Sequence, residues 1–396
     1  SNGLLESVPK FHQESKKVPY DEVRKFKREY LKKAYRNFKP DSNYHQFLKE
    51  CSWVFDYAIF STFAYINDTY DWASWPEEYK NYPQSHRVNL TKYTDQIGYY
   101  QFVQFIFYQQ WFKLKAYANE KGIKIIGDMP FYVDHGSVEV WLDNKSFLLD
   151  EEGYPTSIAG VPPDYFSPTG QYWGNPLYDW DYMETHQFRF WIERIGWASK
   201  IFDITRIDHF RAFDSYWKIP ATAETAIEGH WCYAPGYALF DTIYDSLGQI
   251  ELVAEDLGYL RPEVIELKDH YHLKGMKVFQ FMLDDGYDDL DNSYFYSGTH
   301  DNETILGWVK GLNEENYTKL LEIVGDSLPA NRAVLKYCLH STASDVIIPI
   351  WDLLEVDNDE RFNIPGTVND TNWAYRVSDI ELVNKGLALF TELKNK

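Results

Sequence analysis

The sequence is poor in three features that would point to whole classes of protein: cysteine, basic charge and long apolar runs. Its three cysteines, Cys51, Cys232 and Cys338, are far apart, which excludes a disulfide framework and a C-x-x-C metal or redox pair. Acidic residues outnumber basic ones 60 to 39, and the net charge of −21 argues against nucleic-acid or acidic-membrane partners. No apolar run reaches about 18 residues and no secretory leader is visible, so we expect a cytoplasmic chain.

Motifs for nucleotides and metals are missing as well. Neither G-x-G-x-x-G nor a P-loop occurs, so no nucleotide is expected. The acidic run at 284–291 lacks the ligand order of an EF-hand and the Glu that should close it, which favours a solvated loop. We therefore expect neither a cofactor nor a metal.

Aromatic residues are what the sequence has in excess. Trp, Tyr and Phe make up 18% of the chain. Aromatic rings present flat apolar faces with polar tips, which suit sugar rings that have one face rich in C–H groups. Carbohydrate is also a neutral polymer, which an acidic protein does not repel. The alternative, that the rings fill the core, stays open for any single ring.

The chain changes character near residue 121. Residues 1–121 are expected to form a mainly helical insertion, with helices over 21–38, from 41 or 42 through 63, and over 94–120. A loop rich in Trp, Pro and Tyr is expected at 72–83. The apolar side of the last helix is expected to consist of Phe102, Phe105, Ile106, Trp111, Phe112 and Leu114.

Residues 122–396 alternate short apolar runs with helical stretches. Such alternation predicts parallel strands joined by helical crossovers, with chemistry at the carboxyl ends of the strands, as in a (β/α)₈ barrel of the TIM type. A loop rich in Pro, Gly and aromatic residues stands out between strands at 159–176. The expected strands are 123–128, 202–208, 250–255, 276–281, 294–301 and 346–350.

Three acids stand at the ends of these strands: Asp208, Glu255 and Asp301. Side chains alternate across a strand, so Arg206 shares a face with Asp208 and can hold it ionised. The same alternation places His300 on the face opposite Asp301, so a structural role stays open for His300. Cleavage of a sugar bond with retention uses one ionised carboxylate as the nucleophile and one protonated carboxylic acid as the proton donor.

Several motifs then resemble one family, the 4-α-glucanotransferases, or amylomaltases and disproportionating enzymes. RIDHFR at 206–211 resembles their nucleophile motif, VAEDLG at 253–258 their acid/base motif, and SGTHDN at 297–302 their third-carboxylate motif. The resemblance runs in order from about residue 95 to 376. Further matching segments are 127–130, 159–176, 275–278, 284–286, 361–366 and 372–376.

The resemblance implies transfer of an α-1,4-glucan segment to glucose or a maltooligosaccharide, through a glycosyl-Asp intermediate. It makes Asp208 the nucleophile, Glu255 the acid and base, and Asp301 the carboxylate that binds sugar hydroxyls. It makes the 159–176 loop a lid over the donor chain. The other implied substrate contacts are Asp128, Arg206, His300, Tyr165, Phe166, Gln171, Trp173, Asn175, Asp285, Asn302 and Asn372.

Two departures from the family accompany this resemblance. The first two barrel strands of the family are missing, so we expect that a separate N-terminal fragment supplies them or that they have been lost. The segment between Asp285 and Ser297 is also shorter than in the family, which puts the floor of the acceptor side in doubt. Two alternatives stay open: a hydrolase like α-amylase, and an inactive glucan-binding fragment.

Overall fold

The computed structural model describes residues 3–11, 16–163, 167–258, 260–286 and 289–395. The chain forms two compact units, one made of Ser1–Ser7 and Tyr30–His272 and the other of Val8–Glu29 and Leu273–Lys396. Both combine helices with β-sheets, in an α/β fold. The predicted division at residue 121 follows sequence character and stays a prediction. In the part of the chain described, no helix is long and apolar enough to cross a membrane.

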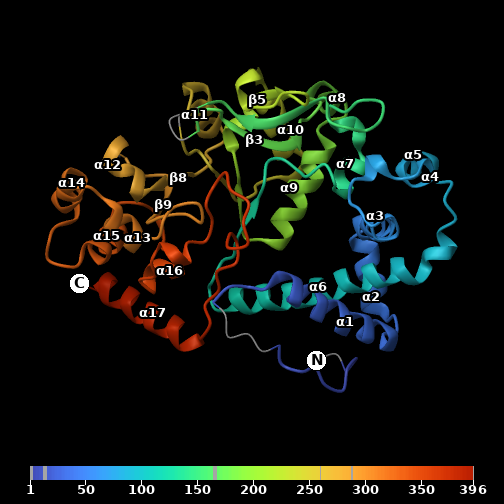
Figure 1. The fold of residues 1–396 in the computed structure, drawn as a ribbon, viewed down its shortest axis with the longest axis horizontal. Coiled ribbons are helices and arrows are strands. Elements are labelled where there is room, and N and C mark those ends of the chain that lie inside the picture. Colours follow the sequence, from blue (N-terminus) through green and yellow to red (C-terminus); the bar gives the residue numbers. More distant parts are fainter. Residues whose placement is uncertain (1–2, 12–15, 164–166, 259, 287–288, 396) are drawn as a thin grey trace. The chain divides into compact units, whose positions relative to one another are not determined.

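The first unit begins with a group of helices. These are α1 (Tyr20–Asn37, whose first half belongs to the second unit), α2 (Ser42–Glu50), α3 (Trp53–Asn67), α4 (Glu77–Lys80), α5 (Tyr82–Ser85) and α6 (Thr94–Glu120). The predicted helices over 21–38 and 94–120 are confirmed. Figure 1 shows α2, α3 and α6 packed together.

Two details of these helices differ from the prediction. The single helix expected from 41 or 42 through 63 is broken at Cys51, whose ψ of 63° leaves the helical region. The break lets Cys51 enter a cluster with Phe47, Val54 and Phe105. On α6, Leu114 is 55% exposed, so the buried stripe is narrower than expected.

A three-stranded parallel sheet follows in the first unit. Its order is β1-β4-β7, with β1 at Ile126–Met129, β4 at Ile204–Ile207 and β7 at Leu252–Ala254. Gly127 allows β1 to approach the ring of Phe202, because a Cβ there would lie 2.0 Å from it. The accompanying helices are α7 (Val138–Leu142), α8 (Trp180–Thr185), α9 (Arg189–Ile201), α10 (Gly236–Leu247) and α11 (Pro262–His270).

The same unit holds a four-stranded antiparallel sheet that the sequence reasoning missed. Its order is β3-β2-β5-β6, from β2 (Ser157–Val161), β3 (Gln171–Pro176), β5 (Ser215–Pro220) and β6 (His230–Tyr233). The segment expected as a loop at 159–176 therefore contributes two paired strands, β2 and β3. The two strands approach each other so closely at position 160 that a residue with a side chain does not fit there. A Cβ at Gly160 would lie 2.2 Å from the carbonyl oxygen of Gln171.

The second unit is built on another parallel sheet, of order β10-β9-β8. The strands are β8 (Gly275–Val278), β9 (Ser293–Tyr296) and β10 (Asp345–Ile347). All six predicted strands are therefore present and pair in parallel, while their closure into a barrel stays a prediction. The helices are α12 (Met282–Asp285), α13 (Ile305–Gly311), α14 (Glu314–Val324), α15 (Ala330–Leu339), α16 (Ile350–Leu353) and α17 (Ile380–Asn395).

Candidate active site

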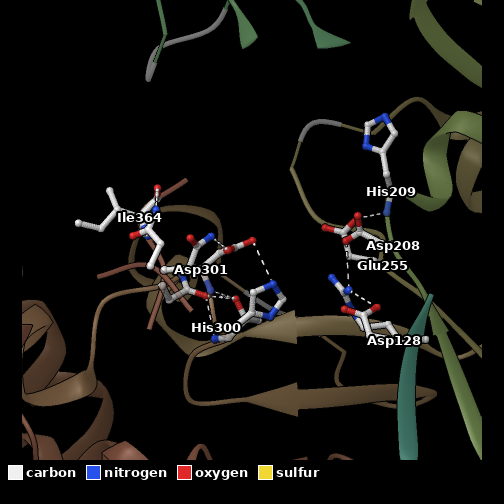
Figure 2. A network of polar contacts seen from close by, with 12 residues as sticks. Asp128, Asp208, His209, Glu255, His300, Asp301 and Ile364 are labelled. Atoms are coloured by element: carbon white, nitrogen blue, oxygen red, sulfur yellow. Dashed lines mark hydrogen bonds and ion pairs between the residues drawn. The ribbon is translucent and has the colours of Figure 1, made fainter. Parts of the chain in front are cut away.

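An arginine and two carboxylates meet at the carboxyl ends of β1 and β4. The register pairs Asp128 with Arg206, and Asp208 follows β4 directly. Arg206 Nη1 lies 2.6 Å from Asp128 Oδ1 and 3.1 Å from Asp208 Oδ1. The predicted pairing of Arg206 with Asp208 is confirmed. Figure 2 shows Asp128, Asp208, His209 and Glu255 in one cluster.

Arg206 is the positive centre of this cluster. Its side chain is only 10% exposed, whereas those of Asp128 and Asp208 are about half exposed. Burial acts to lower the pKa of the guanidinium, but the neighbouring carboxylates raise it by more. The arginine therefore stays charged and pairs with both carboxylates.

The second carboxyl group, that of Glu255, has a raised pKa. Glu255 follows β7, and its Oε2 accepts a hydrogen bond of 2.8 Å from the backbone N–H of His209. Burial, and after it the charge of Asp208, raises the pKa of Glu255 to about 8. Arg206 opposes this rise without cancelling it. Near neutral pH, Glu255 therefore carries a proton that it can donate.

His209 is a site residue that the sequence reasoning missed. Its backbone is left-handed, with φ of 52°, and this turn directs its N–H toward Glu255. The centre of its imidazole ring lies 5.0 Å from the ring centre of Trp173 and 6.2 Å from that of Tyr132. Burial lowers the pKa of His209 to about 3, so its imidazole is neutral. The sequence feature that could have indicated His209 was its position directly after Asp208 in the motif RIDHFR at 206–211.

The predicted lid residues are only partly described. Trp173 lies on β3 beside His209, and its indole N–H donates to Gln171 Oε1 at 3.1 Å. The Asn175 amide donates to the carbonyl of Val133 at 2.9 Å. Tyr165 and Phe166 lie outside the described residues.

The second unit carries a cluster around Asp301. His300 Nε2 lies 3.4 Å from Asp301 Oδ2, and the two side chains face each other in Figure 2. The expectation of opposite faces was wrong, because β9 ends at Tyr296 and strand alternation stops there. Asn363 donates to Asp301 Oδ1 at 2.6 Å. Arg361 donates to the Asp301 carbonyl at 2.6 Å.

Asn363 and Arg361 were missed as site residues, although the motif at 361–366 contains them.

Other predicted contacts of this unit have local roles. Asn302 Oδ1 accepts hydrogen bonds from the N–H and hydroxyl of Thr299, which shapes the turn before Asp301. Asn372 bonds repeatedly within its own 364–372 loop. Asp285 ends α12, and its side chain is not among the described parts. Substrate binding by Asn302, Asn372 and Asp285 stays a prediction.

A protonated carboxylic acid beside an arginine-paired carboxylate, both at the ends of parallel strands, is the equipment of enzymes that cleave glycosidic bonds. Comparison with known proteins narrows this class. The family model of the 4-alpha-glucanotransferases matches residues 2–382. The chain belongs to the 4-alpha-glucanotransferase family, which confirms the family and the enzyme class expected from the motifs.

Individual relatives agree with this assignment. The 4-alpha-glucanotransferase of Thermus thermophilus is 40% identical over 89% of this chain and 75% of its own length. That of Streptococcus pneumoniae serotype 4 is 37% identical over 99% of this chain and 82% of its own length. The amylomaltase of Streptococcus agalactiae, solved in complex with acarbose, matches with a TM-score of 0.90 at 36% identity, covering 97% of this chain and 80% of that one. The amylomaltase of Corynebacterium glutamicum, 14% identical, shares the fold with a TM-score of 0.73 over 94% of this chain and 59% of its own.

Proposed function

We propose that this chain transfers a segment of an α-1,4-glucan to glucose or a maltooligosaccharide by a retaining double displacement. The observation that carries the proposal is the contrast between two neighbouring carboxyl groups. Asp208 lies beside Arg206, whereas Glu255 has its pKa raised to about 8. This contrast matches the two roles that a retaining mechanism needs.

In the first step an oxygen of Asp208 bonds to the anomeric carbon of the donor, and the glycosidic C–O bond breaks. Glu255 gives its proton to the departing 4-hydroxyl oxygen. In the second step ionised Glu255 takes the proton of the acceptor hydroxyl, whose oxygen displaces Asp208 from the anomeric carbon. Both carboxyl groups return to their starting states, and the reaction uses no water and no cofactor.

The remaining predicted contacts have supporting roles in this proposal. Arg206 holds Asp208 and Asp128 in place, and Asp128 contacts the reacting sugar. Trp173 offers an indole to the donor chain, and residues 159–176 limit the access of water to the glycosyl-enzyme. In the second unit, Asp301 binds sugar hydroxyls with His300 beside it. All these roles follow the family resemblance together with the contacts described above.

We also propose that the six parallel strands belong to a (β/α)₈ barrel. Supporting this, the two sheets use their strands in chain order, β1-β4-β7 and β8-β9-β10, and the candidate residues follow the carboxyl ends of the strands. The prediction that a separate fragment supplies two further strands stays a prediction.

The test of the proposed function is incubation of the chain with maltotriose and chromatography of the products, with Asp208→Asn as the control. A transferase yields glucose and a ladder of longer glucans that the variant does not produce. Shortening without longer products would indicate the hydrolase instead. Binding without turnover would indicate an inactive glucan-binding protein.

A further inference from the structure

Two exposed aromatic rings follow each other along one face of β6. Trp231 is 40% exposed and Tyr233 is 71% exposed. Residues two apart on a strand point to the same side and lie roughly 6.6 Å apart. Among the described strands, β6 pairs with β5 alone, so these rings stand at the edge of the antiparallel sheet. We call Trp231 and Tyr233 the β6 strip.

Each ring of the β6 strip is supported by an arginine. The guanidinium carbon of Arg211 lies 4.2 Å from the centre of the Trp231 ring, and that of Arg261 lies 5.1 Å from the centre of the Tyr233 ring. Arg261 is itself held by Asp214 at 3.4 Å and Glu263 at 2.9 Å. Trp231 also packs against Trp217, its partner on β5, in a T-shaped arrangement with the ring centres 5.1 Å apart. The rings are thus fixed in place while a large part of their surface faces solvent.

The supporting arginines connect the β6 strip to the candidate active site. Arg211 comes three residues after Asp208, and Arg261 comes six residues after Glu255. The C-terminal end of β6 is tied to the same region, because the Ala234 N–H donates to the Asp214 carbonyl at 2.8 Å. The segments that carry the two candidate catalytic carboxyl groups therefore also carry the residues that fix the strip.

We propose that the β6 strip is a remote binding site for an α-1,4-glucan chain, where sugar rings of a long donor or acceptor stack on Trp231 and Tyr233. Flat apolar ring faces match the C–H-rich faces of sugars, and the neighbouring guanidinium groups keep the two rings in place for such stacking. The inference rests on the proposed function, because the strip adds affinity for the same substrate class. It extends the binding of long chains and leaves the reacting bond to the carboxyl groups.

The test compares long amylose with maltotriose in the double variant Trp231→Ala/Tyr233→Ala. The ratio of kcat/KM for amylose to kcat/KM for maltotriose should fall about tenfold, since each stacking contact contributes on the order of a threefold change. The double variant Trp231→Phe/Tyr233→Phe keeps both rings and should retain most of the ratio. Tyr117→Ala is the matched control. Tyr117 lies on α6, is 60% exposed and has the ammonium nitrogen of Lys121 5.8 Å from its ring centre, so its removal should not alter the ratio of the two kcat/KM values.

Calorimetric titration of the same proteins with amylose separates this inference from the proposed function. Weaker amylose binding in the Ala variant, with an unchanged melting temperature, supports the strip even if the wild-type chain has no transferase activity. Equal amylose affinity and an equal activity ratio in wild type and Ala variant would overturn it. An equal loss in Tyr117→Ala would also overturn it, because the effect would then belong to exposed aromatic rings in general.

Discussion

At the scale of single residues, the protonation of Glu255 should set the alkaline limit of the reaction. Its raised pKa of about 8 keeps the proton in place near neutrality, and the acid form is lost as the pH rises through that value. We expect kcat/KM to fall tenfold per pH unit above about pH 8, as one required proton is lost. The measurement is a pH–rate profile with maltotriose.

A substrate whose leaving group needs no proton provides the control for Glu255. With an α-maltosyl fluoride donor, formation of the glycosyl-enzyme should lose this alkaline limb. Glu255→Gln should lower transfer from maltotriose by roughly 10²- to 10⁴-fold, the usual contribution of a general acid. An unchanged alkaline limb in Glu255→Gln would assign the titration to another group.

Trp373 shows backbone strain at a bulky residue. Its φ is 60°, and its backbone N–H donates to the Phe362 carbonyl at 2.8 Å. The centre of its indole lies 5.0 Å from the centre of the His300 ring. In this left-handed backbone region, any residue other than glycine loses about 1–2 kcal/mol of stability because its Cβ lies too close to the following carbonyl oxygen. We expect Trp373→Gly to be more stable than Trp373→Ala by about 1 kcal/mol, as measured by urea unfolding.

The reverse order should hold at an ordinary helical position, which makes the comparison specific. Lys113 lies within α6, where glycine is less stable than alanine by about 1 kcal/mol. If Trp373→Ala matched or exceeded Trp373→Gly in stability, the left-handed backbone at Trp373 would not be a source of strain.

Residue-level prediction from the sequence succeeded where a regular strand carried the argument. Arg206 and Asp208 came out as neighbours because β4 reaches Ile207 and alternation still applies one residue later. It failed for His300 because the chain leaves β9 at Tyr296. It missed His209 because its backbone N–H is placed by a left-handed turn that no alternation pattern reveals.

At the scale of elements, Asp352 links the end of β9 to the start of α13. Its buried carboxyl group accepts hydrogen bonds from Ser297 Oγ at 2.8 Å and from the Ile305 N–H at 2.9 Å. Asp352→Ala should cost about 1–3 kcal/mol of unfolding free energy, because both donors lose their partner in a buried place. It should also lower activity, since Asp301 lies in the segment between those two attachments.

Asp352→Asn should be much milder than Asp352→Ala. The amide oxygen can still accept from Ile305, and the amide nitrogen can donate to the Ser297 hydroxyl. A second comparison is Asp357→Ala, which removes an exposed ion pair with Lys310 and a hydrogen bond from the Asn358 N–H. Because the Asp357 side chain is 42% exposed, this loss should be smaller than that in Asp352→Ala. Equal losses in Asp352→Ala and Asp357→Ala, measured by urea unfolding, would contradict the link.

The elements that the sequence predicted well are those with a simple periodic pattern. The six parallel strands are short apolar runs, and α6 is one long stretch without proline that carries apolar residues such as Phe102 and Phe105 at helical spacing, so both were found. The antiparallel sheet was missed because β2 and β3 contain Gly160, Gly174 and Pro176, which read as a loop. The sheet is completed by β5, which pairs with β2, and by β6, which pairs with β5, and both strands lie much later in the chain.

At the scale of the whole molecule, the composition indicated the partner class before any fold was known. A chain with a net charge of −21 creates a strong negative potential around itself, which repels anions and attracts cations. An uncharged glucan experiences neither effect. The aromatic content left two interpretations open. Trp72, Trp141 and Trp191 are buried in the core, which confirms core packing for these rings, while sugar contact by the partly exposed Trp173 and Trp231 stays a prediction.

A neutral substrate makes the rate nearly independent of salt, and this is a sharp test because the charge is large. Raising the ionic strength from 0.01 to 1 M shortens the screening length from about 30 Å to about 3 Å, which would strongly change the encounter with any charged ligand. For maltotriose at pH 6, where Glu255 stays protonated, we expect kcat/KM to change by less than about twofold across this range. Arg206 is only 10% exposed, so its ion pairs with Asp128 and Asp208 are screened less than pairs between fully exposed charges. Because maltotriose carries no charge, a tenfold or larger change with salt would contradict this expectation and would show that screening alters the charged groups of the protein itself.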